Sequence, residues 1–270
     1  MQILKKPVLI VILMVFVLAS SCNKGSDESP INLFSVEDDI EFGKSVEEEI
    51  AANPQDFPIL DEATYPEAYQ HLERIRDSIL NTGLLYYEDK FEWKVRIIRN
   101  DTMLNAFATP GGYMYFYTGL IKYLDDESQF AGVMAHEMSH ADLRHSTSML
   151  TKTYGVQMLL SILLGQANSQ LADIVANLAY GLGELAYSRT MEYQADEKAV
   201  EYLYQTSYDA RGIAGFFLKL DEAPQTPQFL STHPAPENRI EKINEKWTEL
   251  GGKEGNTYVE SYEAFKASLP

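Results

Sequence analysis

One apolar stretch constrains this chain more than any other feature. It reads Phe-Ala-Gly-Val-Met-Ala-His-Glu-Met-Ser-His and covers residues 130–140. Its two histidines, His136 and His140, are four residues apart, which places them one turn apart on the same face of an α-helix. Two imidazoles so placed can both bind one zinc ion. Such a pair also arises by chance on exposed helices. Here the apolar neighbours predict a buried helix over residues 127–142. Two histidines and a glutamate buried in such a helix need partners that bind their polar atoms.

Two acids complete a candidate metal site. Glu137 follows the first histidine, so its carboxylate can act as a general base that takes a proton from water and passes it to the leaving amine. A catalytic zinc also needs a third protein ligand and an open position. Glu192 could be that ligand, while Asp196, one helical turn later, could accept a hydrogen bond from a ligand imidazole. On spacing alone, a solvated acidic face explains Glu192 and Asp196 equally well.

Several separated motifs occur in the order found in one family. This order resembles the HtpX-like and BepA-like zinc peptidases, which are gluzincins, over about residues 36–250. The resemblance implies proteolysis, with one zinc per chain held by His136, His140 and Glu192. It rests on the following segments: Asn105-Ala106-Phe107-Ala108 before Gly111-Gly112, His136-Glu137-x-x-His140, His145, Glu192-x-x-Ala195-Asp196, Thr232-His233-Pro234 and Arg239-Ile240.

His233 has two candidate roles at this site. It could donate to the oxyanion that forms during peptide hydrolysis. It could instead occupy the fourth metal position and keep the enzyme latent, as the resemblance to BepA-like members implies. A loop histidine fixed between its neighbours is the structural alternative. Arg239 could orient His233, pair with Asp196, or be a surface charge. His145 is predicted to interact with the free carbonyls and the dipole at the end of its helix, and not to bind metal.

The segment before the histidine helix is the candidate substrate-binding region. Gly111 and Gly112 suit a tight turn or a close backbone approach. Either residues 105–112 or the aromatic strand 113–118 could bind an extended peptide by edge pairing, although packing in the core also explains the aromatic strand. The predicted substrate-binding residues are Asn105, Ala106, Phe107, Gly111 and Gly112.

The N-terminus carries the features of a secretory signal. Two lysines precede an apolar run over residues 8–18, which is shorter than the about 20 residues of a membrane span. Residues 18–22 resemble a bacterial lipobox, although Ser20 and Ser21 crowd its usual pattern, and this implies lipid attachment at Cys22. We therefore expect a signal peptide over residues 1–22, a flexible tether over 23–35 and a zinc metallopeptidase domain over 36–270.

The remaining pattern predicts an α+β fold that is mostly α, with a small antiparallel or mixed sheet, and the family resemblance implies that this is a zincin-like domain. The net charge of −18 argues against a basic patch that would bind nucleic acid or an anionic membrane. The single cysteine rules out an internal disulfide. We expect a buried helical hairpin after Gly155. The other expected elements are strands at 91–99 and 113–118, and helices at 36–50, 65–80, 127–142, 147–164, 170–187, 190–205, 209–221 and 237–249.

Together with the site residues, the resemblance implies a zinc-dependent endopeptidase that cleaves internal peptide bonds of unfolded or misassembled envelope proteins. We expect it to be lipid-anchored in the bacterial cell envelope, at the periplasmic face of the outer membrane. One alternative is an envelope assembly factor or holdase that binds zinc and has little or no turnover. Another is a zinc hydrolase of a non-peptide bond. The sequence does not select zinc over other divalent metals, because selectivity follows geometry and supply.

Overall fold

The computed structural model describes residues 34–182, 185–221, 227–235 and 238–270. The expected signal peptide, Cys22 and residues 23–33 of the expected tether lie outside these ranges. The described elements are α1 (Val36–Ala52), α2 (Pro66–Leu80), β1 (Lys94–Ile98), β2 (Ala106–Thr109), η1 (Pro110–Gly112), β3 (Tyr113–Tyr117), α3 (Thr118–Tyr123), α4 (Glu127–Asp142), α5 (His145–Tyr154), α6 (Val156–Leu163), α7 (Asn168–Tyr180), α8 (Arg189–Tyr204), α9 (Gly212–Asp221), α10 (Phe229–Thr232), α11 (Arg239–Glu249) and α12 (Val259–Ala267).

The sheet has three strands in the order β1-β3-β2. β1 runs parallel to β3, with Lys94 opposite Tyr113, and β2 runs antiparallel to β3, with Ala106 opposite Phe116. The expected mostly helical fold with a small mixed sheet is therefore confirmed. Strand β2 was not foreseen, because all four of its residues are buried and show no alternation of polar and apolar side chains.

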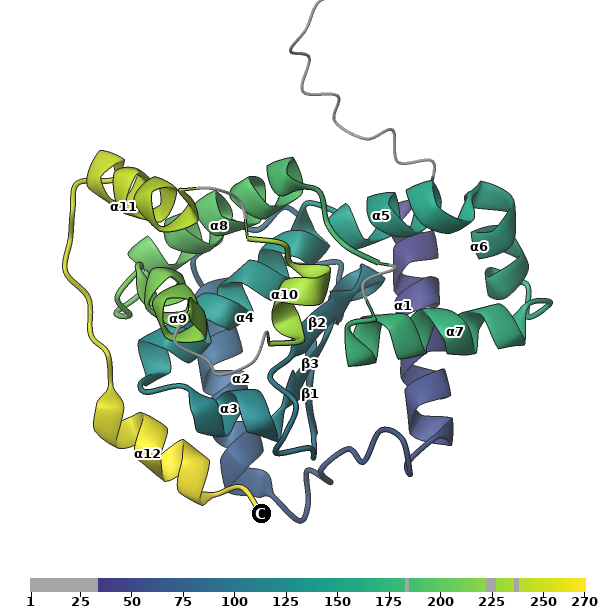
Figure 1. Ribbon diagram of the computed structural model, residues 1–270, viewed down its shortest axis with the longest axis horizontal. Coiled ribbons are helices and arrows are strands. Elements are labelled where there is room, and N and C mark those ends of the chain that lie inside the picture. The colour runs from purple at the N-terminus through teal and green to yellow at the C-terminus, as the bar shows by residue number, and fades with distance from the viewer. Residues whose placement is uncertain (1–33, 183–184, 222–226, 236–237) are drawn as a thin grey trace, which may run out of the picture. The chain divides into compact units, whose positions relative to one another are not determined.

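The sheet separates two hydrophobic cores. Alternate side chains of a strand point to opposite faces, so Met114 and Phe116 face one core while Tyr113, Tyr115 and Tyr117 face the other. The first core, as we call it, packs α2, α4, α8, α9, α11 and α12 onto one face of the sheet. The second core packs α1, α5, α6 and α7 onto the other face. Figure 1 shows α4 between the sheet and α8 and α9, with α1 and α7 on the far side of the strands.

Helix α4 lies in the interior of the first core. It has the bounds predicted from the sequence, and Asp126 caps its first turn by accepting a hydrogen bond from the Gln129 backbone N–H. Every residue of α4 except Gln129 is buried. Its close approach to α9 requires glycine, because a Cβ on Gly132 would lie 2.3 Å from the Ile213 backbone nitrogen. This packing fixes α4 relative to the rest of the core.

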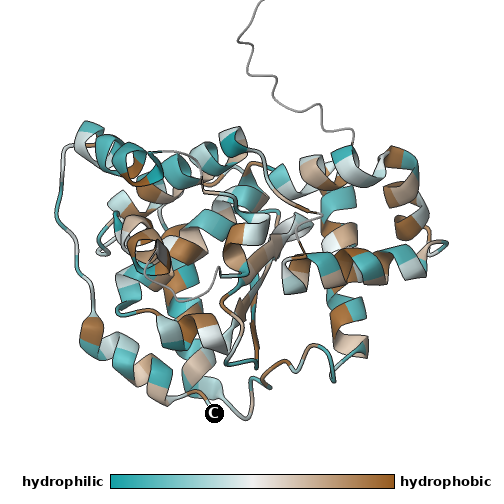
Figure 2. Ribbon diagram, viewed as in Figure 1, coloured by the Kyte–Doolittle hydropathy of each residue, from teal (hydrophilic) through white to brown (hydrophobic). Residues whose placement is uncertain are grey.

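Helix α6, in the second core, is much less completely buried than α4, in the first. Gly155, at φ 77°, ends α5, so the single helix predicted over 147–164 is wrong. The expected buried hairpin is also wrong for α6, in which only Leu159 and Ile162 are buried. Leu160 is 43% exposed, and Leu164 in the following turn is 70% exposed. Figure 2 shows the hydrophobic residues of α6 and α7 in brown.

Crossing a membrane takes a helix of about 20 mostly apolar residues. Among the described residues, none of the helices is both long and apolar enough to do so by itself. Taken together, α6 and α7 are long and apolar enough for a membrane span by length and composition alone, but a bend of 109° separates them.

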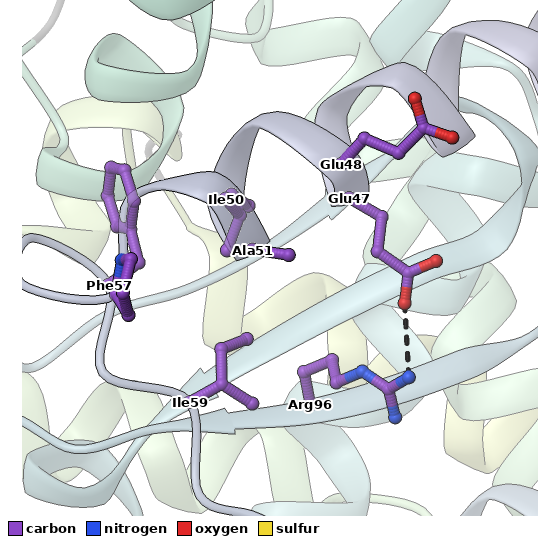
Figure 3. Close-up of a pocket in the computed structure, with 8 residues that line it drawn as sticks. Glu47, Glu48, Ile50, Ala51, Phe57, Ile59 and Arg96 are labelled. Carbon is purple, nitrogen blue, oxygen red and sulfur yellow. Dashed lines mark hydrogen bonds and ion pairs between the residues drawn. The ribbon is translucent and has the colours of Figure 1, made fainter.

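A surface pocket of about 460 Å³ lies between α1, the segment that follows α1, and strand β1 (Figure 3). Apolar side chains, including Ile50, Phe57 and Ile59, line one part of it. At the other part, the Arg96 guanidinium donates to the Glu47 carboxylate over 3.0 Å. None of the candidate metal ligands lines this pocket, so it is separate from the site described below.

Candidate active site

Two helices and one short segment bring the candidate metal ligands together. Helix α4 carries His136 and His140, and α8, which packs against it, carries Glu192. Ser188 caps α8 by accepting a hydrogen bond from the Met191 backbone N–H, which starts the helix one turn before Glu192. His233 follows α10. One ligand atom of each of these four buried residues lies within 4.8 Å of the other three.

The separations between these ligand atoms match the shape of a zinc site. Four ligands at about 2.0–2.1 Å from one tetrahedral ion lie about 3.3 Å from one another. His136 Nε2 lies 3.0 Å from His140 Nε2 and 3.2 Å from His233 Nδ1. Glu192 Oε1 lies 3.3 Å from His140 Nε2 and 3.2 Å from His233 Nδ1, and the other carboxylate oxygen, Oε2, lies 3.6 Å from His136 Nε2. The group therefore suits a four-coordinate zinc ion.

On the His136 side, the partners are charged. The other ring nitrogen of His136, Nδ1, lies 2.9 Å from Asp196 Oδ1. Arg239, at the start of α11, donates from Nη2 to Asp196 and to Glu192, over 2.8 Å in each case. The Arg239 guanidinium is buried and lies over the Phe217 ring, 3.6 Å from its centroid. The structure thus joins a ligand imidazole, two carboxylates and one buried cation.

On the His140 side, the partners are neutral. His140 Nδ1 lies 3.2 Å from Nδ1 of His145, and His145 Nε2 lies 3.1 Å from Gln194 Oε1. The Tyr187 ring stacks on His140, with the ring centroids 3.8 Å apart. Sequence reasoning missed Tyr187 and Gln194, and it related His145 to the helix end and to the family resemblance but not to His140. The five-residue spacing from His140 to His145 was the one available signal.

Glu137 and His233 face each other inside the site. His233 Nε2 lies 3.3 Å from Glu137 Oε1, while His233 Nδ1 belongs to the metal group. Among the described residues, neither Glu137 oxygen has a hydrogen-bond partner of good geometry, although the Ala108 backbone N–H is close enough to lower the pKa of Glu137. A buried carboxylate without hydrogen bonds is costly in a folded protein unless a ligand or water satisfies it. This arrangement fits a group that receives protons from a molecule bound beside it.

Burial and neighbouring charges together set the protonation of the site. It holds the pKa values of His136 and His140 well below their usual range, which keeps both rings neutral. Burial also raises the pKa of Glu137 to about 7. For Glu192 burial acts in the same direction, but the neighbouring His233 and His140 outweigh it and hold its pKa well below the usual value. The ligand set is therefore two neutral imidazoles and a carboxylate, as zinc requires.

Local packing fixes the position of His233. Its ring stacks on Phe229 in α10, with the centroids 4.2 Å apart and the planes at 10°. The His233 backbone N–H donates to the Phe229 carbonyl, and the Tyr187 N–H donates to the Thr232 carbonyl. The metal group, Glu137 and His233 are all buried, so the described residues leave no solvent-exposed position on these ligands.

The five predicted substrate-binding residues are all buried as well. Ala106 and Phe107 belong to β2, and Asn105 just before it donates from its amide to the Ala179 carbonyl over 3.0 Å. The two glycines, by contrast, serve packing. A Cβ on Gly111 would lie 2.8 Å from the Ile40 Cα in α1, and one on Gly112 would lie 3.0 Å from the Phe91 Cβ.

The sequence was also compared with known proteins. Residues 68–247 match peptidase family M48. An Escherichia coli relative, the beta-barrel assembly-enhancing protease, is 35% identical over 157 residues, which are 53% of this chain and 32% of that protein. A Vibrio cholerae relative is 31% identical over 214 residues, 68% of this chain and 44% of its own length. The mitochondrial metalloendopeptidase OMA1 of Schizosaccharomyces pombe is 30% identical over 159 residues, 57% of this chain and 46% of that protein. The chain thus spans less than half of each of these relatives.

Proposed function

The chain belongs to peptidase family M48, and from this premise we propose that it is a zinc metalloendopeptidase of the bacterial cell envelope. Its reaction is the hydrolysis of internal peptide bonds in unfolded or misassembled proteins. One observation carries the proposal: two neutral imidazoles and a carboxylate converge at the separations of a zinc tetrahedron, with Glu137 beside them.

Each residue then has a distinct task. His136, His140 and Glu192 hold the metal, while Asp196 and Arg239 orient His136 and Glu192. Zinc, when bound, polarises the substrate carbonyl and makes water a better nucleophile. Glu137 takes the proton from the attacking water and delivers it to the leaving nitrogen, as a general base and then a general acid.

We further propose that His233 keeps the enzyme latent. A catalytic zinc site uses three protein ligands and leaves one position open, whereas His233 Nδ1 completes a fourth here. The same ring places Nε2 against Glu137, so one side chain covers both the metal and the base. Cleavage requires His233 to leave this position, after which it can donate to the developing oxyanion.

The setting is inferred from the relatives and from the N-terminal sequence. Relatives named for beta-barrel assembly support a role in protein quality control of the envelope. Residues 18–22 support attachment of a lipid at Cys22 and location at the periplasmic face of the outer membrane. A Cys22→Ser variant should lose its membrane association on fractionation of cells, while the unchanged chain stays with the outer membrane.

Cleavage of casein by the zinc-loaded protein tests the activity. We expect Glu137→Gln to bind zinc normally and to lose at least about 100-fold in rate, the low end of what general acid–base catalysis contributes. The His233→Ala variant should cleave faster than the unchanged protein, because it opens the fourth position. Equal rates for the His233→Ala protein and for the same protein with Glu137→Gln added would contradict the proposal.

The second candidate is an envelope assembly factor or holdase that binds zinc with little turnover. The complete burial of the metal group and of Glu137 favours it. It predicts that casein stays intact with every variant, His233→Ala included, while the unchanged protein still suppresses aggregation of an unfolded client protein. A cell-wall amide, cleaved where casein is not, would instead indicate a hydrolase of non-peptide bonds.

A further inference from the structure

His145 and Gln194 form a chain of contacts behind the second metal ligand. Nδ1 of His140 faces Nδ1 of His145 over 3.2 Å, and Nε2 of His145 faces Gln194 Oε1 over 3.1 Å. His145 is buried. Gln194 lies on α8 two residues after Glu192, so the helix that supplies a metal ligand also supplies the last residue of this series of contacts.

Metal binding allows one arrangement of protons along these contacts. His140 points Nε2 at the metal group, where it lies 3.0 Å from His136 Nε2. Binding zinc requires the lone pair of that nitrogen, so the proton of His140 sits on Nδ1. This N–H can donate only if His145 Nδ1 is unprotonated. His145 then carries its proton on Nε2 and donates it to the amide oxygen of Gln194.

We propose that His145 and Gln194 are positioning residues that set the tautomer and the ring orientation of His140 for zinc binding. This inference rests on the proposed function. The partner of a ligand histidine is often a carboxylate, and the Asp196 carboxylate lies 2.9 Å from His136 Nδ1, although the angle between them does not make a hydrogen bond. His140 has a neutral imidazole in that place. The two ligand histidines are therefore held by chemically different partners, one charged and one neutral.

The turn between α4 and α5 places His145 for this role. Helix α4 ends at Asp142, and Arg144 adopts the left-handed conformation at φ 57°, which a non-glycine residue seldom takes. The chain turns there, and α5 begins at His145. The Arg144 guanidinium holds the turn by donating to the Phe34 carbonyl over 2.6 Å and to the Ser35 carbonyl over 2.8 Å.

Long-range ¹H–¹⁵N NMR of the zinc-loaded protein tests the tautomer directly, because protonated and unprotonated ring nitrogens differ widely in ¹⁵N shift. We expect His145 Nε2 and His140 Nδ1 to be protonated and His145 Nδ1 to be unprotonated. A proton on His145 Nδ1 overturns the proposal. A protein that binds no zinc contradicts the proposed function instead, so the two failures are distinguishable.

Zinc affinity, measured by competition with a chromophoric chelator, gives a second readout. His145→Leu removes the acceptor and should weaken zinc binding by about 10–100-fold, the usual effect of losing such a partner. Gln194 is exposed, so two variants there make a matched pair. Gln194→Glu keeps an acceptor and should bind zinc at least as tightly as the unchanged protein. Gln194→Lys lacks a hydrogen-bond acceptor and should bind zinc more weakly than the unchanged protein. Unchanged affinity in a folded His145→Leu protein overturns the proposal.

Discussion

Helices α4 and α6, which belong to the cores on opposite faces of the sheet, are buried to very different extents. In the first core, α4 is buried along nearly its whole length and approaches α9 so closely that glycine is required at Gly132. In the second core, α6 buries two of its residues, and Leu160 and Leu164 face outward. A chain segment of twenty residues, 153–172, contains no charged residue, yet much of it lies at the surface.

The contrast shows where precise geometry is needed. Atoms from α4, α8 and the segment after α10 must stay 3.0–3.6 Å apart to suit one ion. Small shifts between these elements would spoil that match, and close packing resists such shifts. The second core contributes the stacked ring of Tyr187 to the site. Its outer helices, α6 and α7, supply none of the candidate metal ligands, so the metal site does not require them to pack tightly.

Removing zinc should have the largest effect, and it should act on one core. A ligand at a thousand times its dissociation constant stabilises the folded state by about 4 kcal/mol. We expect chelation to lower the free energy of unfolding by that order and to raise amide hydrogen exchange in α4 and α8, with little change in α6. The Glu192→Ala protein, which lacks a ligand, should show a much smaller effect. Equal loss of protection in α6 would mean that the two cores unfold as one unit.

A methyl group added to a glycine should affect the two cores differently. Gly132→Ala places a Cβ against the backbone of α9, and we expect a loss of about 3 kcal/mol, the upper range for overpacking. Gly165→Ala in the turn after α6 is the matched control. No atom lies within 4 Å of its added Cβ, so only the positive φ opposes it, at about 1 kcal/mol. Urea denaturation gives both values, and similar losses would remove the distinction in packing.

The buried Glu127 at the start of α4 should make the first core sensitive to acid. It accepts hydrogen bonds from Arg74, Tyr208 and Ser261. Burial raises its pKa, but these hydrogen bonds and the charge of Arg74 outweigh burial and hold the pKa below 4.5. A carboxyl group with a lowered folded-state pKa stabilises the fold above its unfolded pKa. That contribution is lost as the pH falls through the folded-state value.

Glu127→Gln should therefore cost about 2 kcal/mol at pH 7, the scale of hydrogen bonds to a charged group. The same substitution should cost less as the pH falls below 4.5. Urea denaturation as a function of pH measures both effects. A loss that is equal at all pH values would show that the charge of Glu127 contributes nothing.

The smallest effect is expected on the exposed face of the second core. Leu164→Ser should change the free energy of unfolding by no more than about 0.5 kcal/mol, because its side chain is largely in solvent. Leu171→Ala, on the buried side of the neighbouring α7, should cost about 2–3 kcal/mol. A large loss in Leu164→Ser, measured by thermal unfolding, would show that this face is packed in solution.

Helices with a continuous amphipathic pattern could be predicted from the sequence, and elements whose pattern depends on their surroundings could not. The bounds of α4 were predicted at both ends, since Asp126 caps it and apolar residues fill it. Strand β2 was missed because it is buried on both faces and too short to show a period. The predicted helix over 147–164 was wrong because Gly155, at φ 77°, interrupts it. The helix α12 was missed altogether.

At the site, local spacing was informative and long-range pairing was not. The i, i+4 spacing placed His136 and His140 on one face, and α4 has them there. Whether Arg239 lies at the surface or pairs with Asp196 could not be decided, since the two residues are 43 positions apart. The relation of His145 to His140 also depends on the left-handed Arg144, which no helical pattern predicts.

The sequence by itself determined the chemistry that this protein has available: a helix with two histidines, a neighbouring glutamate, and acids one turn apart on a later helix. Those features depend on the 3.6-residue period of a helix, which is a local property. Only the tertiary structure decided which of these groups meet, that His233 completes the group, and that the two ligand histidines have different partners. Contacts between distant segments follow from how whole cores pack, and packing depends on the shapes of all the residues together.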